Sequence, residues 1–205
     1  MEMEKIVIFG STGMTGLCAV DAALKKGLSV KAFVRDPAKL PEHLRNAVEV
    51  VKGDILDYNT VLDGIKDVMG VVVVLGTRND LSPTTDLSEG LKNIIKAMKE
   101  LNVEVISVCL SAFLFYEPEK VPPQFHDLND EHKRMLQVLQ ASDRKYIACF
   151  PPHIADQPPV DYIVKQGASP GGRVISKYDL GRFLVESLNQ PEHYGQIVGI
   201  CNKPS

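Results

Sequence analysis

A glycine-rich run near the start of the chain has the residue types and spacing of a phosphate-binding loop. Gly10, Gly13 and Gly16 directly follow the apolar run 6–9 and precede a helical pattern over residues 17–26. Such glycines let the backbone turn tightly and approach a pyrophosphate, while the helix N-terminus offers free N–H groups and the positive end of its dipole. A Walker-type mononucleotide loop is excluded, because no Gly-Lys-Ser/Thr ends the run. The pattern predicts a dinucleotide loop formed by Gly10, Thr12, Gly13, Met14, Thr15 and Gly16.

A positive charge follows the second apolar run, residues 29–34. An NAD site usually has an acid at this point to bind the ribose 2′-hydroxyl, whereas an arginine can bind a 2′-phosphate through two N–H groups. We interpret Asp36 as the N-cap of a turn that starts at Pro37, which leaves Arg35 and Lys39 to flank one phosphate. The alternative is that Arg35 is an ordinary solvated charge. The pattern favours NADP(H) over NAD(H).

Two further runs end in residues that suit a cofactor. Gly53-Asp54 follows the third run and is expected to meet the adenine edge. The fourth run ends in Leu75, Gly76, Thr77 and Arg78, where a glycine lets the backbone pass close to the cofactor and an arginine adds positive charge. Gly76 could instead be an ordinary turn glycine.

The fifth and sixth runs are followed by the residues that we expect nearest to the reaction. Ser111 follows the fifth run, and its hydroxyl can orient a carboxamide or a substrate carbonyl. Pro151 and His153 follow the sixth run and are candidate pocket residues. Phe113 and Tyr116 offer apolar surface to a flat conjugated substrate, and Phe115 is better interpreted as a core residue.

Other groups that could do chemistry have simpler interpretations. Tyr116 and Lys120 match the Tyr-x-x-x-Lys pair of short-chain dehydrogenases, but Pro118 would break the helix that must hold them on one face. His132 lies on an apolar helical stripe and is interpreted as a core histidine. Cys109 is expected to be buried in its strand. Since no acid–base pair is evident, solvent can supply the proton if a nicotinamide supplies the hydride.

Apolar runs and helical patterns alternate along the chain, which predicts one doubly wound, mostly parallel α/β sheet with helices on both faces, a Rossmann-like fold. Pro-rich segments 111–126 and 151–172 interrupt the alternation after two strands and are expected to form the substrate walls of a single domain, residues 1–205. The clearest helical pattern spans residues 84–101, with Ser82-Pro83 as cap and first turn. The expected strands are residues 5–9, 29–34, 48–52, 71–75, 105–110 and 146–150, and the further helices are residues 127–141 and 177–189.

Composition narrows the class of protein. The net charge is −3, with 23 basic and 26 acidic residues, which argues against a nucleic-acid partner. The 4 cysteines show neither a CxxC spacing nor a Cys/His ligand pattern, so neither a metal nor a disulfide is expected. There is no apolar run of membrane-spanning length and no targeting pattern. We therefore expect a cytoplasmic protein that has no membrane partner.

The sequence resembles the NADPH-dependent flavin reductases, also called biliverdin-IXβ reductases, which are small atypical short-chain dehydrogenases. The most specific part of the resemblance is the stretch from Leu75 to Thr85, Leu-Gly-Thr-Arg-Asn-Asp-Leu-Ser-Pro-Thr-Thr. The resemblance covers essentially the whole chain, and its other matching segments are residues 10–16, 34–36, 111–114, 120–123, 151–158 and 173–177.

The resemblance implies a monomeric enzyme with an open site above the nicotinamide, which reduces FMN, FAD, riboflavin and linear tetrapyrroles such as biliverdin-IXβ. It implies cofactor contacts at Gly10, Thr12, Gly13, Thr15, Arg35, Asp54, Gly76 and Arg78, and pocket positions at Ser111, Phe113, Pro151 and His153. The chain departs from the family at Tyr116, Gln124 and residues 160–172, so the preferred acceptor stays open. An acceptor carboxylate has candidate partners in Arg78, Lys120 and Arg173.

Two other functions remain to be compared with a reductase. A redox sensor that binds NADP(H) without catalysis is compatible with the missing Tyr/Lys pair, although the substrate walls argue against it. An epimerase or dehydratase acting on a sugar nucleotide is disfavoured, because the chain is small and has no separate substrate domain.

Overall fold

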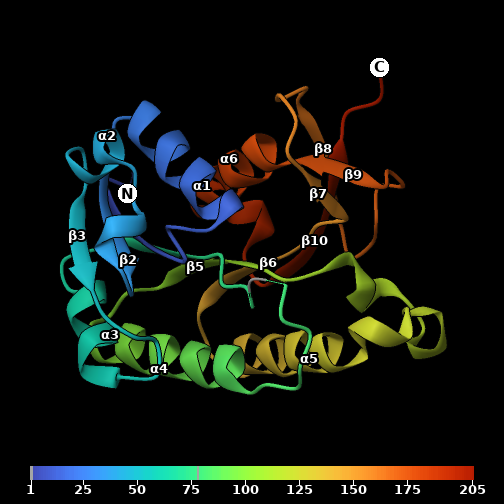
Figure 1. Cartoon of the computed structure of the whole chain (residues 1–205), viewed down its shortest axis with the longest axis horizontal. Coiled ribbons are helices and arrows are strands. Elements are labelled where there is room, and N and C mark those ends of the chain that lie inside the picture. The colour runs from blue at the N-terminus through green and yellow to red at the C-terminus, as the bar shows by residue number, and fades with distance from the viewer. Residues whose placement is uncertain (1, 78) are drawn as a thin grey trace.

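The structure, a computed structural model, describes residues 2–77 and 79–205 and is built on a central sheet of eight strands (Figure 1). The strand order is β3-β2-β1-β4-β5-β6-β10-β8, and every pairing is parallel except that of β10 with β8. The strands are β1 (Lys5–Phe9), β2 (Ser29–Val34), β3 (Glu49–Lys52), β4 (Gly70–Val73), β5 (Val105–Cys109), β6 (Lys145–Phe150), β8 (Tyr162–Gln166) and β10 (Gln196–Asn202). A separate parallel pair is formed by β7 (His153–Ala155) and β9 (Val174–Ser176).

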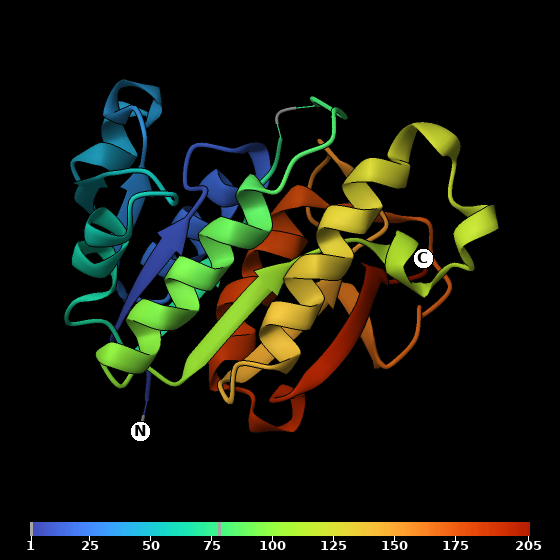
Figure 2. The ribbon, with the colours of Figure 1, turned by 90° about the horizontal axis from the view of Figure 1, so that it is seen from below.

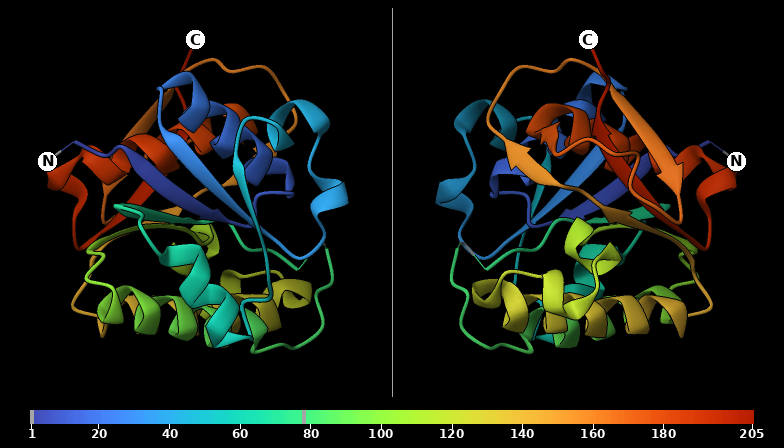
Figure 3. Two further views of the ribbon diagram at one scale, coloured as in Figure 1. Left: turned by 90° about the vertical axis from the view of Figure 1, so that its left-hand side faces the viewer. Right: turned by 90° about the vertical axis from the view of Figure 1, so that its right-hand side faces the viewer.

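Helices cover both faces of the sheet, as the sequence predicts. On one face α1 (Met14–Lys25) packs against α6 (Lys177–Glu186), and on the other α3 (Tyr58–Ile65), α4 (Asp86–Glu100) and α5 (His126–Gln140) lie side by side (Figures 1 and 2). A short helix, α2 (Glu42–Arg45), lies between β2 and β3 in the chain. The end-on views of Figure 3 show the sheet between these two helical layers.

The core lies in two clusters, one on each face of the sheet, because the inner strands are apolar on successive positions. Ile6 and Ile8 of β1 pack towards α1 and α6, whereas Val7 and Phe9 pack towards α3 and α4. All four side chains have an exposed fraction of 0%. This two-sided burial explains why the sequence of β1 shows no polar–apolar alternation.

The sequence predicts six of these strands and misses four, β7 to β10. β8 is a half-exposed edge strand inside the segment predicted as the loop 151–172. β10 contains Gly199, a residue that usually weakens a strand. Here glycine is needed because a Cβ at position 199 would lie 2.2 Å from the carbonyl oxygen of Ala168. Tertiary contact therefore overrides local preference in β10.

The start of α4 also differs from the sequence prediction. The helix begins at Asp86 rather than at residue 84, and Ser82-Pro83 is not its cap. The N-cap residue is Thr85, whose side chain makes no capping hydrogen bond.

Within the described residues, no helix is long and apolar enough to cross a membrane.

Candidate cofactor and acceptor site

The strand order places a topological switch point between β1 and β4, where the connections leave in opposite directions. In doubly wound sheets, ligands bind in the crevice outside the carboxyl ends of the strands at this point. The predicted site segments all follow the carboxyl ends of parallel strands: residues 10–16 follow β1, 35–39 follow β2, 53–54 follow β3, 75–77 follow β4, 111–116 follow β5 and 151–153 follow β6. We call this side of the sheet the carboxyl edge.

The loop after β1 has the backbone geometry of an anion site. The first backbone hydrogen bond of α1 runs from Leu17 N–H to the Gly13 carbonyl at 2.9 Å. The amides of Met14, Thr15 and Gly16 therefore have no carbonyl of their own helix to bind. The N-cap, Gly13, contributes no side chain, and the first turn carries no acid. The end of α1 is thus open to a phosphate.

Close packing requires two of the predicted glycines. A Cβ at Gly10 would lie 2.2 Å from the Val74 carbonyl oxygen, and Gly10 has φ +87°. A Cβ at Gly16 would lie 1.9 Å from the Gly10 carbonyl oxygen. Sequence reasoning missed the part played by Ser11, which is fully buried and donates from Oγ to the Ile8 carbonyl at 2.6 Å. This bond fixes the loop to the end of β1.

The end of β2 has the arrangement predicted for a 2′-phosphate. Asp36 accepts a hydrogen bond from Ala38 N–H at 3.0 Å and caps the short 3₁₀ turn Pro37–Lys39, which confirms its predicted capping role. Arg35 and Lys39 are exposed on either side of this turn. The acid is therefore occupied by its own turn, and the cations remain open to solvent. Their contact with a phosphate stays a prediction.

Asp54 lies in a tight turn directly after β3. Its Oδ1 accepts from Leu56 N–H at 2.9 Å, and its backbone N–H donates to Thr60 Oγ1 at 3.1 Å. These bonds orient the residue at the carboxyl edge next to the end of β2, with the carboxylate exposed. A contact with the cofactor at this position stays a prediction.

Gly76 differs from the loop glycines in the space around it. A Cβ at Gly76 would meet no atom of the described residues within 4 Å, so their packing does not require glycine there. An approaching ligand is a physical reason for its absent side chain. Leu75 and Thr77 flank it at intermediate exposure. Arg78, predicted to contact the cofactor, lies outside the described residues.

One backbone hydrogen bond joins the two segments predicted as substrate walls. Ala112 N–H donates to the Pro151 carbonyl at 2.9 Å, and Pro151 itself is buried. Ser111 caps the 3₁₀ turn Ala112–Phe115, and its Oγ accepts from Phe113 N–H at 3.1 Å. Among the residues that the structure describes, no acceptor is found for the Ser111 O–H, so it can donate to a ligand. His153, on β7, and Arg173, just before β9, are both exposed on the neighbouring pair of strands.

An aromatic cluster follows Ser111, formed by Phe113, Tyr116 and Phe125; we call it the aromatic shelf. The Phe113 ring centroid lies 5.4 Å from that of Tyr116 and 5.2 Å from that of Phe125. Tyr116 is 49% exposed. Sequence reasoning missed Phe125, because only the fold brings its 3₁₀ turn, Pro123–Phe125, back to Phe113. Phe115 is half-buried at the edge of one core cluster, where its ring centroid lies 4.7 Å from that of Phe150, so it packs against the core without being fully part of it.

Tyr116, Lys120 and Cys109 are placed as the sequence indicates, whereas His132, interpreted as a core histidine, is only half-buried. Tyr116 has an extended backbone, and Lys120 ends a separate 3₁₀ turn and pairs with Glu117 at 2.7 Å, so the two residues share no helix. Burial raises the pKa of the Cys109 thiol to about 12, which keeps it protonated at neutral pH. Burial lowers the pKa of His132 to about 4, so its imidazole is neutral at physiological pH.

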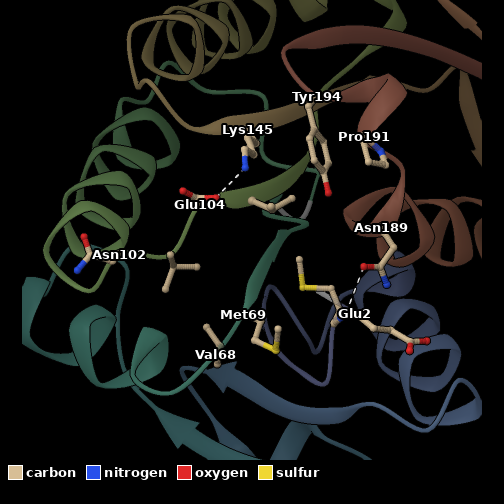
Figure 4. A pocket seen from close by; sticks show the side chains of 12 residues that line it. Glu2, Val68, Met69, Asn102, Glu104, Lys145, Asn189, Pro191 and Tyr194 are labelled. Carbon is tan, nitrogen blue, oxygen red and sulfur yellow. Dashed lines mark hydrogen bonds and ion pairs between the residues drawn. The ribbon is translucent and has the colours of Figure 1, made fainter.

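A cavity of about 810 Å³ lies at the opposite, amino end of the sheet (Figure 4). Its lining mixes polar side chains with apolar ones such as Met3 and Val105. Lys145 Nζ is paired with Glu104 Oε2 at 2.7 Å, and Tyr194 donates to the Leu188 carbonyl at 2.6 Å. These polar groups are already satisfied, and the cavity lies away from the phosphate loop. The carboxyl edge is the better candidate for chemistry.

Comparison with known proteins shows the family of the chain. Residues 10–191 match the model of a family described as NAD(P)H-binding. The oxidoreductase GME11367 of Pestalotiopsis microspora is 32% identical over 48% of this chain and 40% of its own length. The isoflavone reductase homolog A622 of Nicotiana tabacum is 25% identical over 93% of this chain and 66% of its own. The chain thus spans less than two thirds of either curated relative.

A solved structure shows the same fold. A short-chain dehydrogenase/reductase of Veillonella parvula in complex with NADP is 14% identical, with a TM-score of 0.81 over 100% of this chain and 96% of the other. At this identity the likeness concerns the fold alone. The matched family shows that the chain binds NAD(P)H, and the place of the cofactor at the carboxyl edge stays a prediction.

Proposed function

Because the chain belongs to the NAD(P)H-binding family, we propose that it is an NADPH-dependent reductase of flat conjugated acceptors. The acceptors are flavins, namely FMN, FAD and riboflavin, and linear tetrapyrroles of the biliverdin-IXβ type. The printed names of two relatives, an oxidoreductase and an isoflavone reductase homolog, support the reaction class. The observation that carries the acceptor class is the aromatic shelf next to the free hydroxyl of Ser111.

Bound NADPH would supply a hydride, which carries two electrons, and one solvent proton completes the reduction of the acceptor. The amides at the start of α1 would bind the pyrophosphate, and Arg35 with Lys39 the 2′-phosphate. Ser111 would orient the nicotinamide carboxamide or the acceptor carbonyl through its O–H. Phe113 and Tyr116 would hold the acceptor flat by stacking. No side chain is assigned as the proton donor. His153 is exposed and titratable, and it is the first residue to test as a proton donor.

The experiment is to follow NADPH oxidation optically after FMN, riboflavin or biliverdin is added to the purified protein. We expect turnover with at least one of these acceptors and slower turnover with NADH. Phe113→Ala is expected to raise KM for the acceptor while the affinity for NADPH stays unchanged, because only the shelf is altered. The matched control is Phe115→Leu, a conservative change in the core.

The redox-sensor function is favoured by one observation, the separation of Tyr116 from Lys120 on different turns. It predicts that the protein binds NADPH tightly and leaves it unoxidised with every flavin and tetrapyrrole tried. That outcome would overturn the proposed reductase and leave the cofactor assignment in place.

A further inference from the structure

The connection between β4 and α4 is held in place by residues of another helix. It leaves β4 beside the phosphate loop, since a Cβ at Gly10 would touch the Val74 carbonyl oxygen. It then passes through Gly76 and reaches α4 at Asp86 without regular secondary structure in its described residues. Within it, Asp80 N–H donates to the Thr77 carbonyl at 3.1 Å, and Asp80 Oδ1 accepts from Ser82 N–H at 2.9 Å. These bonds shape the segment without fixing it to the rest of the protein.

The far end of this segment is held by α5. Glu131, whose exposed fraction is 0%, accepts at Oε1 from Ser88 N–H at 2.5 Å and at Oε2 from Ser88 Oγ at 3.1 Å. Ser88 is the third residue of α4, so the Glu131 carboxylate takes the place of the side-chain cap that Thr85 does not provide. A negative charge at a helix N-terminus also interacts favourably with the helix dipole.

Arg134, one turn after Glu131, extends the anchor into the connection. Its Nε donates to Glu131 Oε2 at 2.7 Å, and its Nη2 donates to the Thr84 carbonyl at 3.0 Å. Glu131 therefore holds the helix, and Arg134 holds the last part of the loop. A buried carboxylate is tolerated only when it is paired and hydrogen-bonded, and the two bonds from Ser88 and the one from Arg134 Nε satisfy it.

We propose that Glu131 and Arg134 are positioning residues that hold the 79–85 segment at the cofactor crevice. The proposal rests on the proposed function, because it assigns the held segment to NADPH binding. Both ends of the connection are then fixed: one at the phosphate loop through Val74, the other at α5 through Thr84. A loop fixed at both ends loses less conformational entropy when it closes on a ligand, so the anchor raises the affinity for the cofactor.

The decisive variant is Arg134→Met. It removes the bond to the Thr84 carbonyl and the ion pair with Glu131, and it retains the two hydrogen bonds from Ser88 to Glu131. The free energy of unfolding is therefore measured beside the exchange, so that a loss confined to residues 79–85 can be told from a general loss of stability. The arginine side chain is 43% exposed, and methionine keeps most of its aliphatic part at the surface. The matched control is Lys133→Met on the same helix, whose ion pair with Asp130 is long, 3.6 Å, and exposed. Arg134→Lys retains a cationic donor and tests for partial rescue.

Two measurements are made on the full chain. Amide hydrogen exchange of the free protein reports the anchor, and exchange over residues 79–85 is expected to rise in Arg134→Met and to stay unchanged in Lys133→Met. Fluorescence titration reports the cofactor, and the affinity for NADPH is expected to fall about tenfold, a change of ~1.4 kcal/mol. KM for NADPH should rise while KM for the acceptor stays constant, and Arg134→Lys should lie between the two.

Unchanged exchange in Arg134→Met would overturn the anchor. Faster exchange with unchanged NADPH affinity would overturn the positioning role. Both outcomes differ from failure of the proposed function, in which the wild-type protein itself neither binds nor oxidises NADPH; that result would also remove the assigned role of the segment.

Discussion

At the scale of single residues, the candidate site contains two kinds of polar group: some are already hydrogen-bonded within the protein, and others are open to a ligand. Asp36 is occupied by its own turn, and Arg35 beside it is exposed. Ser11 is buried and bonded, and the helix amides after it are open. A ligand with two kinds of phosphate, such as NADPH, would satisfy both open groups.

The first prediction concerns Arg35. In Arg35→Ala, the affinity for NADPH should fall by ~10- to 150-fold, because a hydrogen bond to a charged group contributes about 1.5–3 kcal/mol. The affinity for NADH, which has no 2′-phosphate, should change little. Titration of the variant with both cofactors measures the ratio of the NADPH affinity to the NADH affinity. Lys99→Ala at the far end of α4 is the control. Equal losses for the two cofactors would refute the 2′-phosphate assignment.

The second prediction compares two glycines of the site. Gly16→Ala should lower the free energy of unfolding by about 3 kcal/mol, because its Cβ would overlap the Gly10 carbonyl oxygen. Gly76→Ala should leave stability within ~0.5 kcal/mol, since its Cβ meets open space, and yet weaken cofactor binding. Urea unfolding and NADPH titration of both variants test the pair. If Gly76→Ala binds NADPH normally, the close approach at this position is wrong.

At the scale of elements, the β4–α4 connection and the 151–172 segment are each anchored by an acid and an arginine three residues later on a neighbouring helix. Glu131 and Arg134 hold the β4–α4 connection. Asp179, 1% exposed near the start of α6, accepts from Val160 N–H at 2.9 Å and pairs with Arg182. Arg182 also bonds Asp161 at 2.7 Å. The 151–172 segment thus has its own anchor, formed by Asp179 and Arg182.

The third prediction concerns that second anchor. Asp179→Ala should lower the free energy of unfolding by ~2–3 kcal/mol, because it removes a charge-assisted bond and leaves Val160 N–H unpaired. Asp179→Asn, which can still accept a hydrogen bond, should cost less. Denaturant unfolding measures both, with Asp21→Ala as the control because its pair with Lys25 lies at the surface. Equal losses in Asp179→Ala and Asp21→Ala would contradict the anchor.

At the scale of the whole molecule, a titrating group in the helical layer links stability to pH. Burial lowers the pKa of His132 from its usual value of 6.5 to about 4. Between these values the unfolded chain binds a proton that the folded chain does not, so stability falls as the pH falls. Carboxylates with a lowered pKa, such as Glu49 and Glu104, lose their contributions below about pH 4.5, mostly outside this window.

The fourth prediction follows because His132 and the carboxylates titrate in different pH ranges. Since one pKa unit corresponds to about 1.4 kcal/mol, His132 should lower the free energy of unfolding by ~3 kcal/mol from pH 7 to pH 4. His132→Gln should flatten that slope, and the exposed His43→Gln should leave it unchanged. Denaturant unfolding at several pH values gives the slopes, and an unchanged slope in His132→Gln would show that other groups cause it.

Much of the fold was predictable from the sequence, because the inner strands are short apolar runs with helical patterns between them. β8 and β10 were not, since one is a half-exposed edge strand and the other contains a glycine that only its contact with Ala168 explains. The cap of α4 was predicted wrongly for a similar reason. Its acceptor, Glu131, lies 43 residues away from Ser88 in sequence, and no local pattern indicates such a partner.

By itself, the sequence determined the phosphate loop of this protein. Its glycines, the strand before them and the helix after them are contiguous, so their backbone geometry follows from neighbouring residues alone. The tertiary structure alone decided how the acceptor side is built. The Ala112–Pro151 bond, the packing of Phe125 on Phe113 and the anchors from α5 and α6 join segments distant in sequence. Such contacts depend on how the sheet and its helices pack, and one sequence does not show that packing.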